Sequence, residues 1–314
     1  MSDVKIATRE AYGKALAELG DKYDFVVLDA DLSEATKTKI FADKFPERFF
    51  DTGIAEGNMM STAAGLASCG KTVFASSFAM FAAGRAFEQI RNSICYPKLN
   101  VKIGATHGGI SVGEDGATHQ CLEDLGIMRT IPDMVVINPC DAVEAKAAVE
   151  AAINYYGPVY LRFCRLATPV IFDENTYKFE IGKGIVLKDG SDVTIVASGL
   201  MVNDALKASE MLEKEGISAA VIDIHTIKPI DKDLLVEYAK KTGAIVTAEE
   251  HNIYGGLGSA GAEVISETVP VPVLRVGVND KFGKSGTPAA LFEEYRLTAD
   301  EIYNKAKETI KIKK

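Results

Sequence analysis

The sequence predicts an α/β protein with two doubly wound domains, each a mostly parallel sheet covered by helices on both faces. Short apolar runs, typical of buried parallel strands, alternate with segments in which apolar residues return every three or four positions. This alternation indicates strands and helices in turn, which pack as layers. The pattern dissolves once, over residues 166–191, and then resumes, so we expect two successive units.

The first domain is expected over residues 1–170. Apolar runs predict its strands at residues 25–28, 72–75, 101–103, 134–137 and 159–163. The segments between these runs are rich in Ala, Leu, Glu and Lys, which favour helices. We therefore predict helices at residues 9–19, 59–68, 81–93 and 142–155.

Residues 171–190 are expected to link the domains, because Asp173, Glu174, Asn175 and several glycines interrupt the periodicity. The second, smaller domain is expected over residues 191–314. Its strands are predicted at residues 193–196, 219–222, 244–247 and 273–276. Its helices are predicted at residues 204–214, 231–241 and 260–268.

Composition excludes several classes of protein. The net charge of -9, with no block of Lys and Arg before the last residues, argues against a nucleic-acid partner. No apolar stretch is long enough to span a membrane and the amino terminus lacks an apolar signal core, so we expect a cytoplasmic protein. The five cysteines are an odd number with no close pair, which suggests reduced thiols and no zinc cluster.

A polar loop at residues 113–120 follows the predicted strand at 101–103 and His107. Together with His107 it holds two of the four histidines, and it also contains Asp115. The carboxyl end of a parallel strand is where open α/β sheets bind ligands. His107 and His119 could donate to hydroxyl or phosphate oxygens, and Asp115 could accept from a sugar hydroxyl. A metal site is the competing interpretation, but no His-x-x-His or Cys-x-x-Cys spacing supplies further ligands.

Each of the other candidate site residues has both a functional and a structural interpretation. Glu56 begins a helix of small residues, either as a first-turn glutamate favoured by the helix dipole or as a desolvated acid ready for proton transfer. Phe78 and Phe81 could stack on a planar heterocycle or belong to the core. Arg9 and Arg165, like Arg162, could neutralise a phosphate or form surface ion pairs.

Four segments taken in order resemble transketolase. They are Ala7-Thr8-Arg9, Gly53-Ile54-Ala55-Glu56-Gly57-Asn58-Met59, Phe78-Ala79-Met80-Phe81-Ala82-Ala83-Gly84, and Thr106-His107 with the following Gly113-Glu114-Asp115-Gly116-Ala117-Thr118-His119-Gln120. The resemblance covers the pyrimidine-binding and carboxy-terminal domains of that thiamine-diphosphate enzyme. It implies that the first domain is of the pyrimidine-binding type and the second of the transketolase carboxy-terminal type.

The resemblance implies a role for each candidate residue. Glu56 looks like the catalytic glutamate that hydrogen-bonds the aminopyrimidine ring of thiamine diphosphate, and Phe78 and Phe81 look like the aromatic wall of that pocket. Asp31 matches an aspartate close to the cofactor. A further aromatic residue of the family is Ala75 here.

The substrate residues are implied in the same way. His107 and His119 resemble catalytic histidines that contact the ketose, and Asp115 resembles the aspartate that reads its C2 hydroxyl. Arg9 and Arg165 match phosphate-binding arginines. A phosphate-contacting serine of the family falls near Ala35, so fine specificity does not transfer.

The chain has no Gly-Asp-Gly motif, which in full-length transketolases holds magnesium and the diphosphate. The sequence thus resembles the carboxy-terminal subunit of a split transketolase. The resemblance implies thiamine diphosphate, Mg²⁺ held mainly by an amino-terminal partner subunit, sugar phosphate substrates and an α2β2 assembly. We expect no metal ligand from this chain itself.

Three alternatives stay open. The Asp-Gly-x-Thr-His loop and the Arg162-x-x-Arg165 ending also fit 1-deoxyxylulose-5-phosphate synthase, which is normally one long chain. A transketolase for a specialised sugar is the second. A non-catalytic scaffold is the third, although a scaffold has no physical need for Glu56, His107, Asp115 and His119 together. The β subunit of 2-oxo-acid dehydrogenases shares the layout but resembles the loop poorly.

Overall fold

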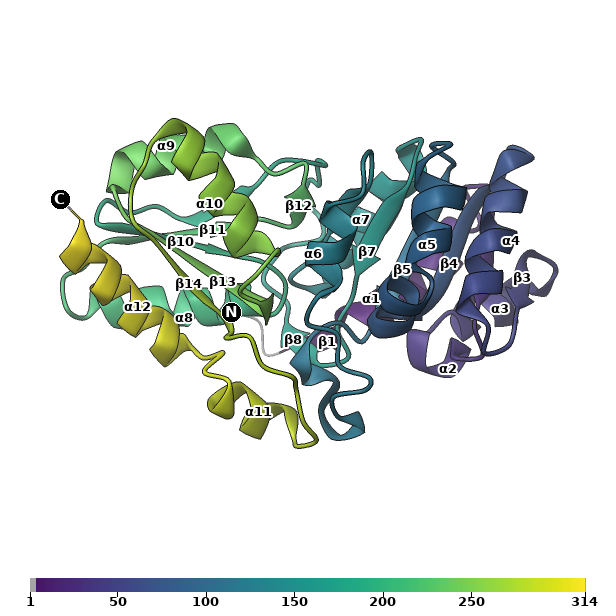
Figure 1. The fold of residues 1–314 in the computed structure, drawn as a ribbon, viewed down its shortest axis with the longest axis horizontal. Helices are drawn as coiled ribbons and strands as arrows, with labels where there is room; N and C mark the ends of the chain where they lie inside the picture. Colours follow the sequence, from purple (N-terminus) through teal and green to yellow (C-terminus); the bar gives the residue numbers. More distant parts are fainter. Residues whose placement is uncertain (1–3, 314) are drawn as a thin grey trace.

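The computed structural model describes residues 4–313, which form two α/β units side by side (Figure 1). The first unit contains a seven-stranded sheet, parallel except at one edge. In spatial order its strands are β12 (Thr226–Lys228), β6 (Val135–Ile137), β7 (Val159–Arg162), β5 (Val101–Thr106), β4 (Thr72–Phe78), β2 (Phe25–Asp29) and β3 (Phe49–Asp51).

Alternate residues of these strands point to opposite faces of the sheet, and each face is covered by helices. In β2, Val27 packs into one apolar cluster, whereas Val26 and Leu28 pack into another. The first cluster is covered by α1 (Thr8–Leu19) and α7 (Ala142–Asn154). The second is covered by α4 (Glu56–Ser68), the π-helical segments Met80–Arg85 and Ile90–Cys95, and α6 (Asp124–Arg129). Residues 4–170 thus form the predicted doubly wound layer structure.

Short elements complete the first unit. The helices α2 (Ser33–Thr36), α3 (Lys39–Lys44) and α5 (Phe87–Gln89) and the 3₁₀ turns Pro46–Arg48 and Ile110–Asp115 join the main elements. A two-stranded antiparallel ribbon pairs β1 (Lys5–Ala7) with β8 (Ala167–Pro169).

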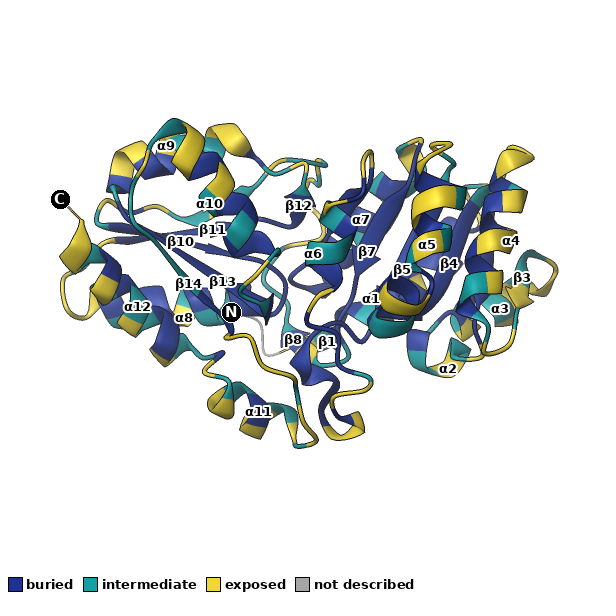
Figure 2. Ribbon diagram, in the orientation of Figure 1, coloured by how far each residue is buried: buried dark blue, intermediate teal, exposed yellow. Residues whose placement is uncertain are grey.

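The second unit has a five-stranded sheet. Its spatial order is β14 (Val273–Val278), β13 (Ile245–Asn252), β10 (Val193–Ala197), β11 (Ala219–Asp223) and β9 (Ile185–Lys188), with β9 antiparallel. On one face lie α8 (Met201–Glu213), α11 (Pro288–Glu294) and α12 (Ala299–Ile312), and on the other α9 (Lys232–Thr242) and α10 (Leu257–Thr268). The central strands of both sheets are buried, whereas the edge strands β3 and β9 and the outer helix faces are more exposed (Figure 2).

The two units are connected by a shared sheet and by a shared apolar cluster. Strand β12 follows β11 in the chain but pairs with β6, so the second half of the chain supplies an edge of the first sheet. The apolar cluster under α4 also continues through Ile224 and Ile227 to α9 and α10. The strand β9 lies inside residues 171–190, where only a link was expected, and pairs with β11.

The predicted strands and helices are confirmed at every predicted position, with shifted ends. The helix predicted at 81–93 is a series of π-helical and α-helical turns. The sequence did not predict five of the short strands, β1, β3, β8, β9 and β12, each three or four residues long. It also did not predict α12, although its buried Ile302, Ala306 and Thr309 follow helical spacing. Among residues 4–313, no helix is long and apolar enough to cross a bilayer.

Candidate active site

The candidate residues come from the carboxyl ends of neighbouring strands and from the starts of two helices. Phe78 ends β4, His107 follows β5, and Arg165 follows β7. Glu56 is the first residue of α4, and Arg9 lies in the first turn of α1. Because β4, β5 and β7 are adjacent and parallel, these ends meet at one edge of the sheet.

His107 is held in one orientation and one protonation state. Its ring stacks on Phe78, with centroids 3.7 Å apart. Arg9 Nη1 lies 3.1 Å from His107 Nε2, and since arginine can only donate, Nε2 accepts. The proton of the neutral ring is therefore on Nδ1, which donates to Thr106 Oγ1 at 2.9 Å. Burial, followed by the charges of Arg9 and Arg165, lowers the pKa of His107 to about 3.

His119 joins the same aromatic group from the loop. Its ring meets the rings of Phe78 and Phe81 edge-on, with centroids 6.4 and 5.4 Å apart. The Phe78 and Phe81 rings are nearly parallel, 12° apart, with centroids 5.9 Å apart. His119 remains partly exposed, and its Nδ1 lies 3.0 Å from Thr118 Oγ1. The two histidines and two phenylalanines thus form one contiguous cluster.

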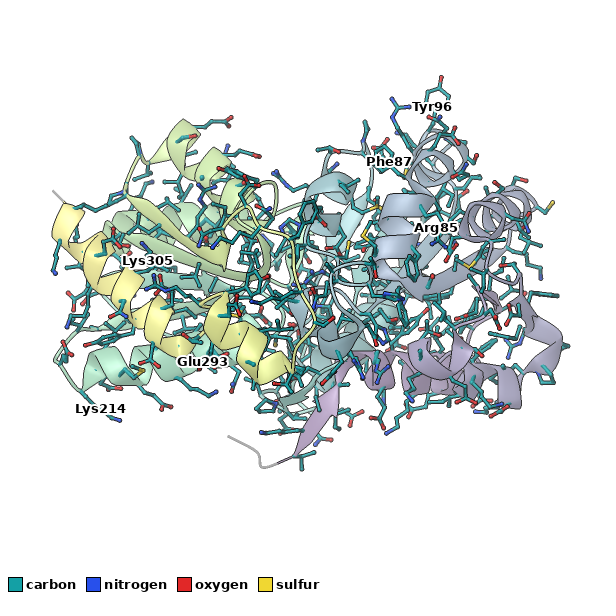
Figure 3. The ribbon with its side chains drawn as sticks, turned by 60° about the horizontal axis from the view of Figure 1, so that its bottom comes forward. Arg85, Phe87, Tyr96, Lys214, Glu293 and Lys305 are labelled. Carbon is teal, nitrogen blue, oxygen red and sulfur yellow. The ribbon has the colours of Figure 1, made fainter. Side chains whose placement is uncertain are left out.

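Glu56 is buried and has a cationic partner that the sequence did not reveal. Its side chain is 1% exposed, and Arg85 Nη1 donates to Oε2 at 2.7 Å. The same guanidinium lies 4.5 Å over the ring of Phe81. Arg85 projects from the π-helical segment of the first unit and is about half exposed (Figure 3). Glu56, Arg85 and Phe81 are therefore linked directly.

Two arginines give the site a positive corner. Arg9 donates to the Ala35 carbonyl at 2.9 Å, and its Nε is buried without a hydrogen-bond partner. Burial and the nearby charge of Arg165 lower the pKa of Arg9. Arg165 donates to the Val112 carbonyl and lies 3.5 Å from Glu114 Oε2 and 3.9 Å from the exposed Asp115 Oδ2. The two guanidinium groups could neutralise an anion at this corner.

Asp31 takes no part in these contacts. It lies in the turn after β2 with a positive φ of 62°, and its amide donates to Asp51 Oδ1 at 3.1 Å. Arg162, considered above as a phosphate ligand, is instead buried in an ion pair: its Nε donates to Asp124 Oδ2 at 2.8 Å. Because it is buried in this pair, Arg162 has a structural role.

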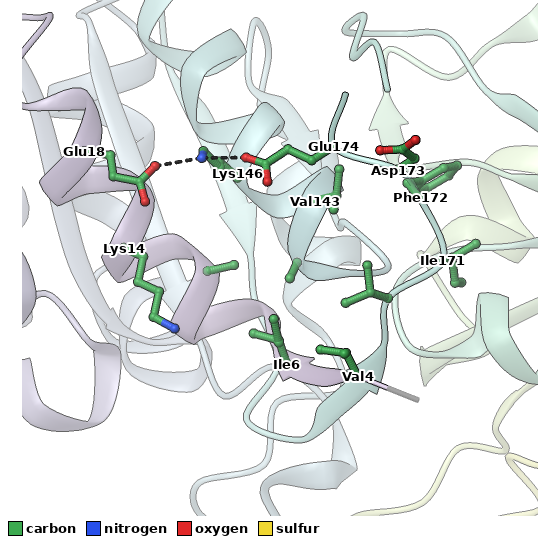
Figure 4. Close-up of a pocket in the computed structure, with 13 residues that line it drawn as sticks. Val4, Ile6, Lys14, Glu18, Val143, Lys146, Ile171, Phe172, Asp173 and Glu174 are labelled. Carbon is green, nitrogen blue, oxygen red and sulfur yellow. Dashed lines mark hydrogen bonds and ion pairs between the residues drawn. The ribbon is translucent and has the colours of Figure 1, made fainter. Parts of the chain in front are cut away.

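A separate hollow of about 560 Å³ lies elsewhere on the first unit, between α1, α7 and the segment after β8 (Figure 4). Ile6, Val143 and Phe172 are among its apolar lining residues. At its edge Lys146 bridges Glu18 and Glu174, at 2.7 Å from each. None of the candidate site residues lines this hollow.

The chain matches the family "Transketolase, pyrimidine binding domain" over residues 4–170 and "Transketolase, C-terminal domain" over residues 182–302. It is 52% identical to the provisionally named transketolase C-terminal section of Methanocaldococcus jannaschii, covering 99% of this chain and 98% of that protein. It is 45% identical to the 6-deoxy-6-sulfo-D-fructose transketolase subunit SqwH of Clostridium sp. (strain MSTE9), covering 96% and 93%.

A solved structure described as "Split gene transketolase, inactive beta4 tetramer" has the same fold. The two chains superpose with a TM-score of 0.91 at 56% identity, covering 99% of this chain and 100% of the other. The alternation of strands and helices, His107 with the loop that carries His119, and these similarities all indicate the same family. The chain belongs to the transketolase family and has its pyrimidine-binding and carboxy-terminal domains.

Proposed function

We propose that this chain is the carboxy-terminal subunit of a thiamine-diphosphate-dependent transketolase. With a diphosphate-binding partner subunit, it transfers a two-carbon ketol unit from a ketose phosphate to an aldose phosphate. The observation that carries this proposal is the continuous group formed by the aromatic cluster, Arg85 and the buried Glu56. An aromatic wall beside a buried carboxylate and two histidines fits a heterocyclic cofactor with a polyol at its edge.

The residues fit the pyrimidine half of thiamine diphosphate. When bound, this cofactor supplies the electron sink for two-carbon transfer. Phe78 and Phe81 offer ring faces and edges for stacking, and Glu56 offers a buried carboxyl to hold a proton at a ring nitrogen. In the structure Arg85 is paired with the Glu56 carboxyl group. Because the Arg85 side chain is half exposed, it can turn into solvent and leave this carboxyl group free for the pyrimidine ring. Asp31 is proposed to lie near the cofactor, on the resemblance alone.

The substrate is proposed to lie along the histidines, with its phosphate toward Arg9 and Arg165. The acceptor nitrogen of the neutral His107, Nε2, takes a hydrogen bond from Arg9 in this structure, and a sugar hydroxyl would take that place as Arg9 turns to the phosphate. The partly exposed His119 is free to contact the transferred unit, and Asp115 to accept from the C2 hydroxyl. The unpaired Nε of Arg9 supports an anion there.

A partner subunit is proposed to hold the diphosphate and Mg²⁺ in an α2β2 assembly, because this chain has no Gly-Asp-Gly motif. An inactive β4 tetramer described for a chain 56% identical to this one supports a need for that partner. We further propose domain limits of 1–170 and 191–314 and a cytoplasmic location, which fits the five free cysteines.

Pentose phosphates are the first substrates to test. The sulfo-sugar named for one relative makes a specialised ketose the second candidate. The test measures ketol transfer from xylulose 5-phosphate to ribose 5-phosphate, with thiamine diphosphate and Mg²⁺, by the chain alone and with its partner subunit. We expect activity only in the mixture, lost in Glu56→Gln and kept in the exposed control Glu267→Gln. Activity of the chain alone would refute the subunit proposal, and transfer from pyruvate to glyceraldehyde 3-phosphate would favour the synthase alternative.

A further inference from the structure

The two glycines that follow His107 are packed against one residue from each unit. A Cβ at Gly108 would lie 2.6 Å from Nε of Arg162, in the first unit. A Cβ at Gly109 would lie 2.3 Å from Oε1 of Glu250, in the second unit. Gly109 also has a φ of +87°, which side chains rarely adopt. The turn after His107 is therefore fitted closely between Arg162 and Glu250.

Glu250 lies near the end of β13 and is 2% exposed. Its Oε1 accepts from the amide of Ser111 at 2.6 Å, and its main-chain carbonyl accepts from Arg162 Nη2 at 3.0 Å. Burial raises the pKa of Glu250 to about 7, and the Arg162 charge and the Ser111 amide act in the opposite direction. Through these contacts the second unit holds Gly109 and Ser111, at the start of the segment that leads to Asp115.

The second unit also holds the end of this loop. Gln120 Nε2 donates to the Lys284 carbonyl at 3.0 Å. A Cβ at Gly113 would lie 3.2 Å from Cδ of Pro288, in the first turn of α11. Between these points the loop carries Asp115 and His119, so its path depends on residues of the second unit.

We propose that Glu250 is a positioning residue of the active site, through which the carboxy-terminal domain fixes the loop that sets His107 and Asp115. This inference rests on the proposed function, because it assumes that His107 and Asp115 contact the sugar. Glu250 acts through the Ser111 amide and the space left by Gly109, and touches neither cofactor nor substrate itself. The carboxy-terminal domain thereby contributes to substrate binding from outside the site.

The neighbouring carboxylate provides a matched control. Glu249 is 1% exposed on the same strand, and its oxygens accept from the amides of Leu257 and Gly258 at 2.7 and 2.8 Å. Those amides begin α10, within the second unit, so Glu249 does not contact the loop through them. The variants are Glu250→Ala, Glu250→Gln, which keeps an oxygen for Ser111, and Glu249→Ala. Glu250→Asp, which draws the carboxylate back, replaces Glu250→Ala if the latter does not fold.

In the complex with the partner subunit, Glu250→Ala should raise KM for xylulose 5-phosphate about tenfold, the effect of losing a hydrogen bond to a charged group. Its kcat should change less, and Glu250→Gln should recover most of the affinity. Glu249→Ala should leave this KM near the wild-type value. An unchanged KM in both Glu250→Ala and Glu250→Asp, or an equal rise in Glu249→Ala, would overturn the inference.

Hydrogen exchange of the full chain, measured without substrate, separates this inference from the proposed function. The Ser111 amide should exchange faster in Glu250→Ala than in the wild type or Glu249→Ala. If it does so while the wild-type complex transfers no ketol unit, the loop contact stands and the proposed function fails. Equal exchange in all three proteins would refute the loop contact, whatever the activity.

Discussion

Arg9 donates to Nε2 of His107 across 3.1 Å, which keeps an imidazole in the site as a neutral acceptor. Burial is the main reason that the ring stays neutral, and the charges of the two neighbouring arginines add to this effect. The contact joins the first helix to the end of a central strand, 98 residues apart in the chain.

His107 should stay neutral over the physiological range. Its pKa of about 3 lies below the 6.5 of an ordinary histidine, so the unfolded chain binds more protons between these values. The His107 contribution to the free energy of unfolding should therefore fall as pH falls below 6.5. NMR of the imidazole carbons should show no His107 titration between pH 5 and pH 8. A midpoint near 6.5 would contradict the structure. In Arg9→Ala the pKa should rise only in part, because burial is its main cause.

Arg85 should stabilise the isolated chain through Glu56. Arg85→Met leaves a buried carboxylate without its cation and should lower the free energy of unfolding by about 1–2 kcal/mol, a modest loss because Arg85 is half exposed. Adding Glu56→Gln should recover most of this loss, which a double-mutant cycle in urea would show. Arg91→Met, which removes an exposed arginine of the next π-helical segment, is the control. Strict additivity of Arg85→Met and Glu56→Gln would mean that the pair is not coupled.

Lys102 should make stability rise with pH above neutrality. Its side chain is fully buried in β5, where Nζ donates to the carbonyls of Tyr155 and Gly157, each at 2.6 Å. Burial lowers its pKa from 10.5 to about 7, so between these values the unfolded chain binds the extra proton. The free energy of unfolding of the wild type minus that of Lys102→Met should grow by about 1.4 kcal/mol per pH unit in this window. A difference independent of pH would show that Lys102 stays charged in the folded chain.

Asp223 should have the opposite pH dependence. Its side chain is fully buried beside a second carboxyl group, and burial, followed by Glu144, raises its pKa well above the usual range. The folded chain then holds a proton that the unfolded chain releases above pH 4, so stability falls as pH rises from there. Asp223→Asn should remove this decline and stabilise the chain at pH 7, whereas the exposed control Asp280→Asn should not. Urea denaturation at pH 5 and pH 7 tests this, and a loss of stability in Asp223→Asn would contradict it.

The Asp223 environment also shows what spacing cannot reveal. Potential ligand atoms of Cys140, Glu144 and Asp223 lie within 4.8 Å of one another, although Asp223 belongs to the second unit. Cysteine spacing gave no sign of this grouping, because its members are brought together by the packing of β11 near the start of α7. The pairing of Arg162 with Asp124 was hidden for the same reason.

The fold class, the order of the main strands and helices, and the loop that follows β5 could all be predicted from the amino-acid sequence. These features depend on local periodicity and on the type of residue at strand ends, both of which can be read along the chain. Four features became visible only in three dimensions: β12 crosses to the first sheet, Arg85 pairs with Glu56, His107 is neutral, and Glu250 contacts the start of the loop. Each of these depends on burial and on atoms far apart in sequence meeting in space, which no local pattern encodes.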